Sequence, residues 1–140
     1  MHIPVCETQK VNILTFEEAL TSREESAVYD RKRWLYIPDF YSEYRYILGT
    51  VGKKPLITIG INPSTAEPDN LDNTLKSVSR IAAGNGFDSF IMFNVYAQRA
   101  TNPDHMDKEL NENLHRENMR AFRYVLERGG VEPAVWAAWG

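Results

Sequence analysis

The stretch Leu56-Ile57-Thr58-Ile59-Gly60-Ile61-Asn62-Pro63-Ser64 decides the fold of this chain. Its run of apolar and β-branched residues ends abruptly in a Gly-Ile-Asn-Pro-Ser sequence, which predicts a buried strand that leads into a tight turn. A second predicted strand, Phe90-Ile91-Met92-Phe93-Asn94, also ends in an asparagine. In open α/β sheets, ligands bind outside the carboxyl ends of the strands. Asn62 and Asn94, at two such strand ends, therefore indicate a ligand site.

The first third of the chain predicts a helix followed by antiparallel strands. The capping-box sequence Thr15-Phe16-Glu17-Glu18 predicts a helix that continues to about Ser26. Aromatic and branched residues over 33–37 and 44–48 predict two strands, and the glycines and proline of 49–55 predict the turn that follows them. These strands would form an antiparallel edge beside the strand that ends at Gly60.

The remaining two thirds alternate between helices and strands. We expect a helix that begins between Asp69 and Asp72 and ends at Gly84-Asn85-Gly86, a strand over 90–96, a helix over 107–128 and a buried strand over 133–139. This alternation predicts a three-layer α/β fold with a central, mostly parallel sheet, helices on both faces and the antiparallel N-terminal edge.

The length of 140 residues suits a single α/β domain over 1–140, in which residues 1–14 form a flexible arm. A hydrophobic content of 43% and a charged content of 25% indicate an ordinary globular core rather than a disordered chain. Because the sequence stops at Gly140, directly after a predicted buried strand, we expect a C-terminal portion of the domain to be missing.

The net charge of −3 argues against a molecule whose whole surface binds a phosphate backbone. Nucleic-acid binding would depend on a local patch, either Arg31-Lys32-Arg33 or the helix face with Arg116, Arg120 and Arg123, although solvated charge balanced by nearby glutamates is the simpler interpretation. The single cysteine, Cys6, excludes an intrachain disulfide, and the sequence shows neither an apolar leader nor a stretch of membrane-spanning length. We expect a cytoplasmic protein that does not bind a membrane, and the sequence leaves the oligomeric state open.

The chemistry of the first candidate residue, Asn62, is that of a carboxamide with one acceptor and two donors. It is not a strong base, but it can orient a water molecule or hold the polar edge of a ligand. Pro63 biases Asn62 toward an extended backbone, and Ser64 and Thr65 can place amides and hydroxyls around the same spot. The simpler alternative is an Asn-Pro turn in which Asn62 bonds its own backbone.

The second candidate, Asn94, can pair in a bidentate way with the edge of a nucleobase, which suits a pocket that receives an extruded base. Tyr96 or Phe93 could stack on such a base. His105 could reach the same end of the sheet, although an exposed loop histidine is the simpler interpretation. We expect Asp69 or Asp72 to cap a helix. The less favoured alternative is that one of these carboxylates activates a water molecule. No histidines show metal-ligand spacing, so we expect neither a metal nor a cofactor.

Three motifs resemble those of the uracil-DNA glycosylase superfamily, in the same order and over roughly residues 56–140. Gly60-Ile61-Asn62-Pro63 resembles the GINPG motif of mismatch-specific uracil/thymine DNA glycosylases, whose asparagine positions the attacking water. The Phe90 to Asn94 strand, followed by Arg99-Ala100, resembles the strand whose asparagine reads the uracil edge in the classical enzymes. Trp136-Ala137-Ala138-Trp139-Gly140 resembles their LLWG strand. The resemblance implies their three-layer fold.

Asn62 is thus the candidate catalytic residue. The candidate residues that bind a base or another ligand are Gly60, Ile61, Pro63, Ser64, Thr65, Asn94, Tyr96 and His105.

The longer string Gly60-Ile61-Asn62-Pro63-Ser64-Thr65-Ala66, with Asp72-Asn73-Thr74 and the Asn94 strand, resembles the family known as domain of unknown function 1643. That family occurs in bacteria and phages, and it implies a fold without an established activity. We regard it as a remote relative of the glycosylases.

The sequence also departs from the glycosylase pattern. Ser64 replaces a glycine or tyrosine, no aromatic residue between Ser64 and Phe87 can stack on a base, and the catalytic His-Pro loop would lie after Gly140. Three hypotheses follow: an enzyme that hydrolyses the N-glycosidic bond of a nucleobase in nucleic acid, a non-catalytic nucleotide- or nucleic-acid-binding module, and an enzyme that acts on free nucleosides or nucleotides.

Overall fold

A computed structural model describes residues 13–22, 29–99, 108–130 and 132–137 of the chain. Its centre is one mixed sheet whose strands lie in the order β1-β2-β4-β3-β5. The strands are β1 (Trp34–Ile37), β2 (Ile47–Thr50), β3 (Pro55–Gly60), β4 (Ser89–Asn94) and β5 (Ala134–Ala137). β3 pairs in parallel with both β4 and β5, whereas β2 pairs antiparallel with β1 and β4. The expected α/β sheet with an antiparallel N-terminal edge is confirmed, but among the described strands it is mixed rather than mostly parallel, because antiparallel and parallel pairings are equally frequent.

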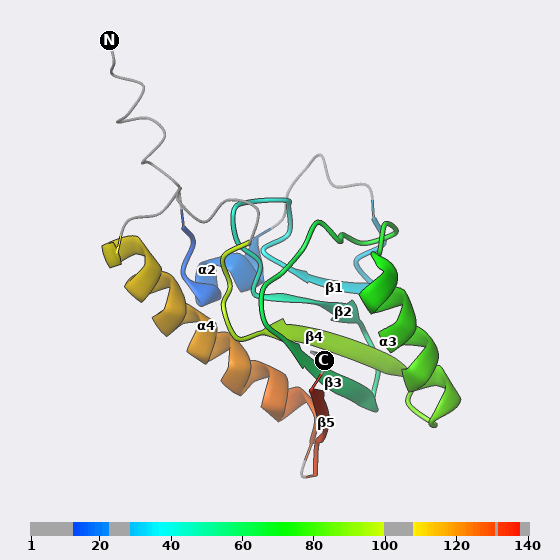
Figure 1. Cartoon of the computed structure of the whole chain (residues 1–140). Coiled ribbons are helices and arrows are strands. Elements are labelled where there is room, and N and C mark those ends of the chain that lie inside the picture. Colours follow the sequence, from blue (N-terminus) through cyan, green and yellow to red (C-terminus); the bar gives the residue numbers. More distant parts are fainter. Residues whose placement is uncertain (1–12, 23–28, 100–107, 131, 138–140) are drawn as a thin grey trace.

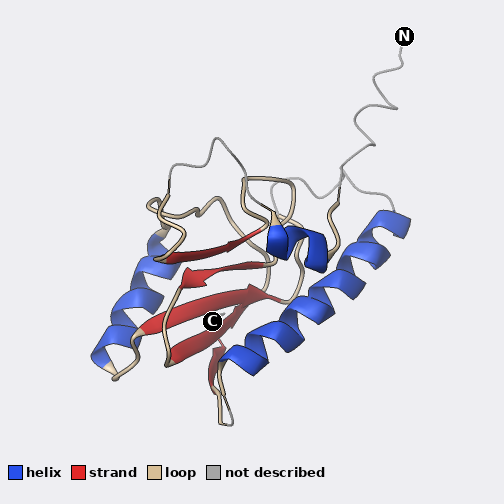
Figure 2. Cartoon of the chain, turned by 180° about the vertical axis from the view of Figure 1, so that it is seen from behind, coloured by secondary structure: helices blue, strands red, loops and turns tan. Residues whose placement is uncertain are grey.

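Helices cover both faces of this sheet, with α3 (Asn73–Gly84) on one face and α2 (Phe16–Thr21) and α4 (Lys108–Arg128) on the other (Figures 1 and 2). Alternate residues of the central strands explain this arrangement. Ile57 and Ile91 pack in the cluster that contains α2 and α4, whereas Leu56 and Phe90 pack in the cluster that contains α3. Both faces of β3 and β4 are therefore buried, as their near-continuous apolar sequences predict.

Local sequence signals set the helix ends. Thr15 and Glu18 form the predicted capping box, but α2 ends at Thr21 because Ser22 is already extended, so the expected continuation toward Ser26 is wrong at that point. Asp72 caps α3 by accepting a hydrogen bond from the Leu75 amide. The expected arm over 1–14 lies almost entirely outside the described residues.

Three strands differ from the prediction. The strand expected over 90–96 is β4, which ends at Asn94. The strand expected over 44–48 begins later, at Ile47, and continues through Gly49 and Thr50. Gly49 permits this because an added Cβ would lie 2.3 Å from the Phe90 carbonyl oxygen, so only glycine allows β2 to approach β4 so closely here. The last strand, β5, was expected to be buried but lies at the sheet edge, with Val135 48% exposed.

Candidate ligand cavity

The carboxyl ends of β3 and β4 bring the two predicted asparagine segments side by side. Gly60 and Asn94 are partners in the parallel register. The pairing extends beyond the strands, because the amide of Val95 donates to the Gly60 carbonyl at 2.9 Å and the amide of Tyr96 donates to the Ile61 carbonyl at 2.9 Å. The turn that follows β3 and the segment that follows β4 therefore leave the sheet together.

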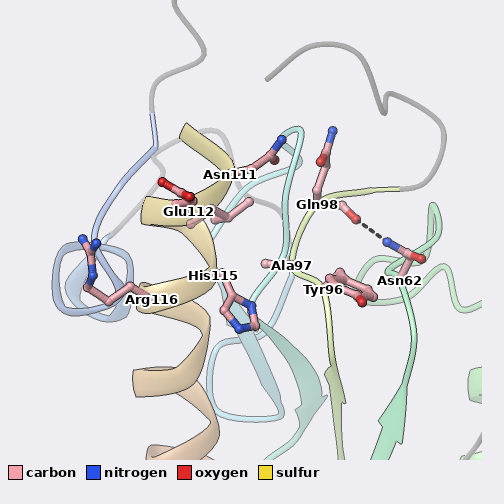
Figure 3. Close-up of a pocket in the computed structure, with 9 residues that line it drawn as sticks. Asn62, Tyr96, Ala97, Gln98, Asn111, Glu112, His115 and Arg116 are labelled. Carbon is pink, nitrogen blue, oxygen red and sulfur yellow. Dashed lines mark hydrogen bonds between the residues drawn. The ribbon is translucent and has the colours of Figure 1, made fainter. Parts of the chain in front are cut away.

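A cavity of about 930 Å³ lies between these segments and the first turns of α4 (Figure 3). Its lining residues are Asn62, Tyr96, Ala97, Gln98, Asn111, Glu112, Leu114, His115 and Arg116. This volume is within the range of small-molecule sites in proteins. Figure 3 shows the His115 ring extending from α4 toward Ala97, whereas Arg116 extends to the opposite side of the helix.

Asn62 is held in one orientation at the edge of this cavity. Its side-chain Nδ2 donates to the Gln98 carbonyl oxygen at 3.1 Å. With Nδ2 engaged, the carboxamide presents its Oδ1 on the side that faces away from α4 (Figure 3), where it can accept a hydrogen bond from a water or a ligand. Tyr96, whose side chain is 55% exposed, lies beside Asn62 in the same cavity (Figure 3).

Asn94 lies apart from this cavity. It is only 3% exposed and, like Phe90 and Met92, it faces the α3 side of the sheet. Its Oδ1 accepts a hydrogen bond from Arg45 Nη2 at 3.2 Å, and a Cβ at Gly60 would lie 2.8 Å from its Nδ2. The structure thus brings Asn62 and Tyr96 together, but it does not bring the two asparagine side chains to one cavity.

The other predicted residues of the turn after β3 have different environments. Ile61, Ser64 and Thr65 are exposed, and Pro63 is buried. The Ser64 hydroxyl donates to the carboxylate of Asp72, the residue that caps α3. His105 lies outside the described residues.

Asp72 is the acidic residue whose role the structure shows most directly. Its Oδ1 accepts from the Leu75 amide at 2.9 Å, and its Oδ2 accepts from Ser64. Both oxygens are therefore engaged in capping the helix and holding the turn, which favours the capping role over water activation. Among the described residues, no group of three or more His, Cys, Asp or Glu side chains could hold a metal ion. No described helix is long and apolar enough to cross a membrane.

Sequence reasoning missed two kinds of residue at this end of the sheet. Arg45 and Arg99 are 2% and 1% exposed, although arginine is rarely buried so completely. Asn118 on α4 is fully buried and donates to the carbonyls of Asn94 and Val95. A signal for Asn118 exists in the sequence, because it follows Leu114 by four residues and so occupies an apolar position of the helix.

The fold and the cavity define an α/β protein with a five-stranded mixed sheet and a ligand-sized hollow at the carboxyl ends of its central strands. The chain belongs to the family described as Protein of unknown function (DUF1643), whose model matches residues 45–140. No curated protein and no solved structure gives a significant match to the chain. The resemblance to this family is thus confirmed, and the likeness to uracil-DNA glycosylases stays a prediction.

Proposed function

We propose that the protein binds a nucleobase in the cavity beside Asn62 and hydrolyses the N-glycosidic bond that joins the base to its sugar. The observation that carries this proposal is the carboxamide of Asn62 at the edge of the cavity, whose Nδ2 donates to the Gln98 carbonyl at 3.1 Å. This bond favours one orientation of the side chain and leaves its acceptor oxygen unengaged by Gln98 (Figure 3). An oriented acceptor beside a ligand cavity is what a residue needs to position an attacking water.

The proposed reaction consumes one water molecule. The water oxygen attacks the anomeric carbon while the carbon–nitrogen bond breaks and its electron pair leaves with the base. One water proton passes to a side chain of the cavity and reaches the departing base nitrogen, so the products are the free base and a sugar hydroxyl. Asn62 orients the water, and Glu112 or His115, which also line the cavity, accepts the proton.

Tyr96 supplies an aromatic ring, which the turn after β3 lacks. No aromatic residue lies between Ser64 and Phe87, the region in which the glycosylases carry a ring that stacks on the base. The Tyr96 ring is 55% exposed and lines the cavity next to Asn62. Stacking of a base on an aromatic side chain contributes about 1–3 kcal/mol, so Tyr96 is the proposed platform for the base.

The test uses single- and double-stranded oligonucleotides that contain uracil or another altered base, with abasic sites as the product measured. We expect cleavage by the wild-type protein and a loss of about a hundredfold or more in Asn62→Ala. Tyr96→Ala should raise KM with a smaller effect on kcat, since it removes binding rather than water orientation. Asn113→Ala is the matched control, because Asn113 lies on α4 outside the cavity lining and is exposed.

Binding without hydrolysis is the second candidate, and the position of Asn94 favours it. The glycosylase resemblance assigns the reading of the base to this residue, but its Oδ1 is already bonded to Arg45. Calorimetric titration with uridine and other nucleosides distinguishes the candidates. Saturable binding that Tyr96→Ala weakens, with no abasic product from any oligonucleotide, would support the binding module and contradict the hydrolase. Cleavage that survives in Asn62→Ala would contradict the assigned role of Asn62.

A further inference from the structure

Two arginines are buried together on the α3 side of the sheet, away from the cavity. We call Tyr36, Arg45 and Arg99 the arginine cluster. Tyr36 is 6% exposed, and the two arginines are 2% and 1% exposed. The three groups act on one another electrostatically: burial raises the pKa of Tyr36 to about 12 even though the charges of Arg99 and Arg45 oppose this rise, and the charge of Arg99 adds to the effect of burial in lowering the pKa of Arg45.

The hydrogen-bond partners of these arginines among the described residues are all neutral. The charge of Asp72 acts on Arg45 and that of Glu67 on Tyr36, but within the described ranges neither carboxylate forms a hydrogen bond or an ion pair with the cluster. Arg45 donates to the Ala66 carbonyl and to Asn94 Oδ1, each at 3.2 Å. Arg99 donates to the carbonyls of Ser42 and Ser64, and its guanidinium lies 4.0 Å from the centre of the Tyr41 ring. The ion pairs found among the described residues, Arg31–Asp39 and Arg120–Glu117, include neither arginine of the cluster.

Three hydrogen-bond donors of the cluster remain unused. Arg45 Nε, Arg99 Nη2 and the Tyr36 hydroxyl are buried and have no hydrogen-bond partner in the part of the chain that the structure describes. Buried cations without an opposite charge are strongly unfavourable, and so are buried donors without acceptors. Burial together with the neighbouring Arg99 lowers the pKa of Arg45 to about 10, which reflects this cost. Among the described residues, no carboxylate supplies acceptor oxygens to these three donors.

We propose that the arginine cluster is a binding site for a phosphate group, held by Arg45, Arg99 and the Tyr36 hydroxyl. A phosphate carries up to two negative charges to offset the two guanidinium charges, and it has enough oxygens to accept from all three unused donors. The guanidinium of Arg99 stacks 4.0 Å from the centre of the Tyr41 ring, and Tyr41 is itself 45% exposed, so the aromatic side chain that contacts Arg99 reaches the surface.

The phosphate can come from two sources, free inorganic phosphate or a nucleotide. The site faces α3 and shares none of its three residues with the cavity of Asn62 and Tyr96. The proposal of a phosphate site is therefore independent of the proposed hydrolysis of an N-glycosidic bond.

The contrasting explanation is purely structural. In that case the arginines only hold the turn between β3 and α3, since they donate to the carbonyls of Ser64 and Ala66. Tyr36→Phe separates the two explanations. It removes a hydroxyl that bonds to nothing, so a structural role predicts unchanged or slightly higher stability and no effect on ligands. A phosphate site predicts the same stability and a phosphate affinity about threefold to tenfold lower.

The experiment is calorimetric titration of the wild-type full chain with inorganic phosphate at constant ionic strength, with chloride as the reference salt. We expect saturable binding at one site and a melting temperature that rises with phosphate but not with chloride. Arg99→Gln and Arg45→Gln should each weaken binding by about tenfold or more. Arg120→Gln, an exposed cation on α4, is the matched control and should bind like the wild type.

Titrations with uridine monophosphate and uridine distinguish the two sources. Tighter binding of the monophosphate than of inorganic phosphate, lost in Arg99→Gln, identifies the phosphate of a nucleotide, whereas equal affinities identify free phosphate. Absence of saturable, phosphate-specific binding to the wild-type chain would overturn the proposal even if the arginine variants do not fold. Unchanged affinity in both Tyr36→Phe and a folded Arg99→Gln would overturn it as well.

Discussion

Replacement of Asn118 tests how α4 holds the end of β4. Asn118 is 0% exposed, and its Nδ2 donates to the Asn94 carbonyl at 2.9 Å and to the Val95 carbonyl at 3.0 Å. These two carbonyls lie where the chain leaves the sheet toward Tyr96. A single side-chain amide therefore joins the helix to the segment that lines the cavity.

The expected cost of Asn118→Ala follows from counting polar groups. The substitution leaves the buried Asn94 carbonyl and the part-buried Val95 carbonyl without this donor, and each buried unsatisfied group costs about 1–3 kcal/mol. The substitution also removes the Asn118 Oδ1, a buried acceptor without a partner among the described residues. Removal of this unsatisfied atom offsets the cost of about one of the two carbonyls. The net loss is about one unsatisfied carbonyl plus the lost packing of the side chain. We expect the free energy of unfolding to fall by about 2–3 kcal/mol.

Urea denaturation followed by circular dichroism measures this difference, with Asn113→Ala as the control. Asn113 lies on the same helix but is exposed and bonds only to Arg116, so its loss should cost about 0.5 kcal/mol or less. Asn118→Asp should have a lower free energy of unfolding than Asn118→Ala at neutral pH, because it replaces the donor with a buried carboxylate oxygen that faces two carbonyls. If Asn118→Ala matched Asn113→Ala, or if the aspartate variant were the more stable of the two, the reasoning would be refuted.

Two further predictions concern positions away from the candidate sites. Gly49→Ala should lower the free energy of unfolding by about 3 kcal/mol, because the new Cβ would lie 2.3 Å from the Phe90 carbonyl oxygen. Gly84→Ala should be neutral or slightly stabilising, because no atom lies within 4 Å of the new Cβ. Equal melting temperatures for the two variants would contradict this. Hydrogen bonds from the amides of Lys54 and Lys53 hold the pKa of Asp88 below its usual value, so its contribution to stability is present above that usual value and is lost as the pH falls through the lowered one. Asp88→Asn should therefore be less stable than the wild type at neutral pH, with a difference that shrinks in acid; a difference independent of pH would argue against this linkage.

The local signals in the sequence account for much of the fold. The Thr15 capping box, the Asp72 cap and the strand that ends at Gly60 all lie where the residue patterns place them. These features depend on residues a few positions apart, and their physical causes operate within one turn of helix or one strand. The helical spacing likewise identified Leu75 and Val78 as core residues of α3.

Features that depend on distant partners were not predictable in the same way. The boundary of β2 is set by the close approach of Gly49 to Phe90, 41 positions later in the chain. The exposure of β5 follows from its place at the edge of the sheet, which no pattern within the strand encodes. Burial of Arg45 was missed for the same reason. It lies in an aromatic run that indicates a strand, and its partners, Ala66 and Asn94, come from two other segments.

Asn94 shows how a correct signal can point to an incomplete role. The sequence identifies it as a polar residue at the end of a buried strand, and the structure gives it polar partners on both sides of the sheet. Its side chain accepts from Arg45 on the α3 side, and its carbonyl accepts from Asn118 of α4. A residue that reads a base needs a free amide edge, but here the amide oxygen already accepts a hydrogen bond from a buried guanidinium. The polar signal at the end of β4 therefore reflects, at least in part, the packing of Arg45 and α4 around this strand end.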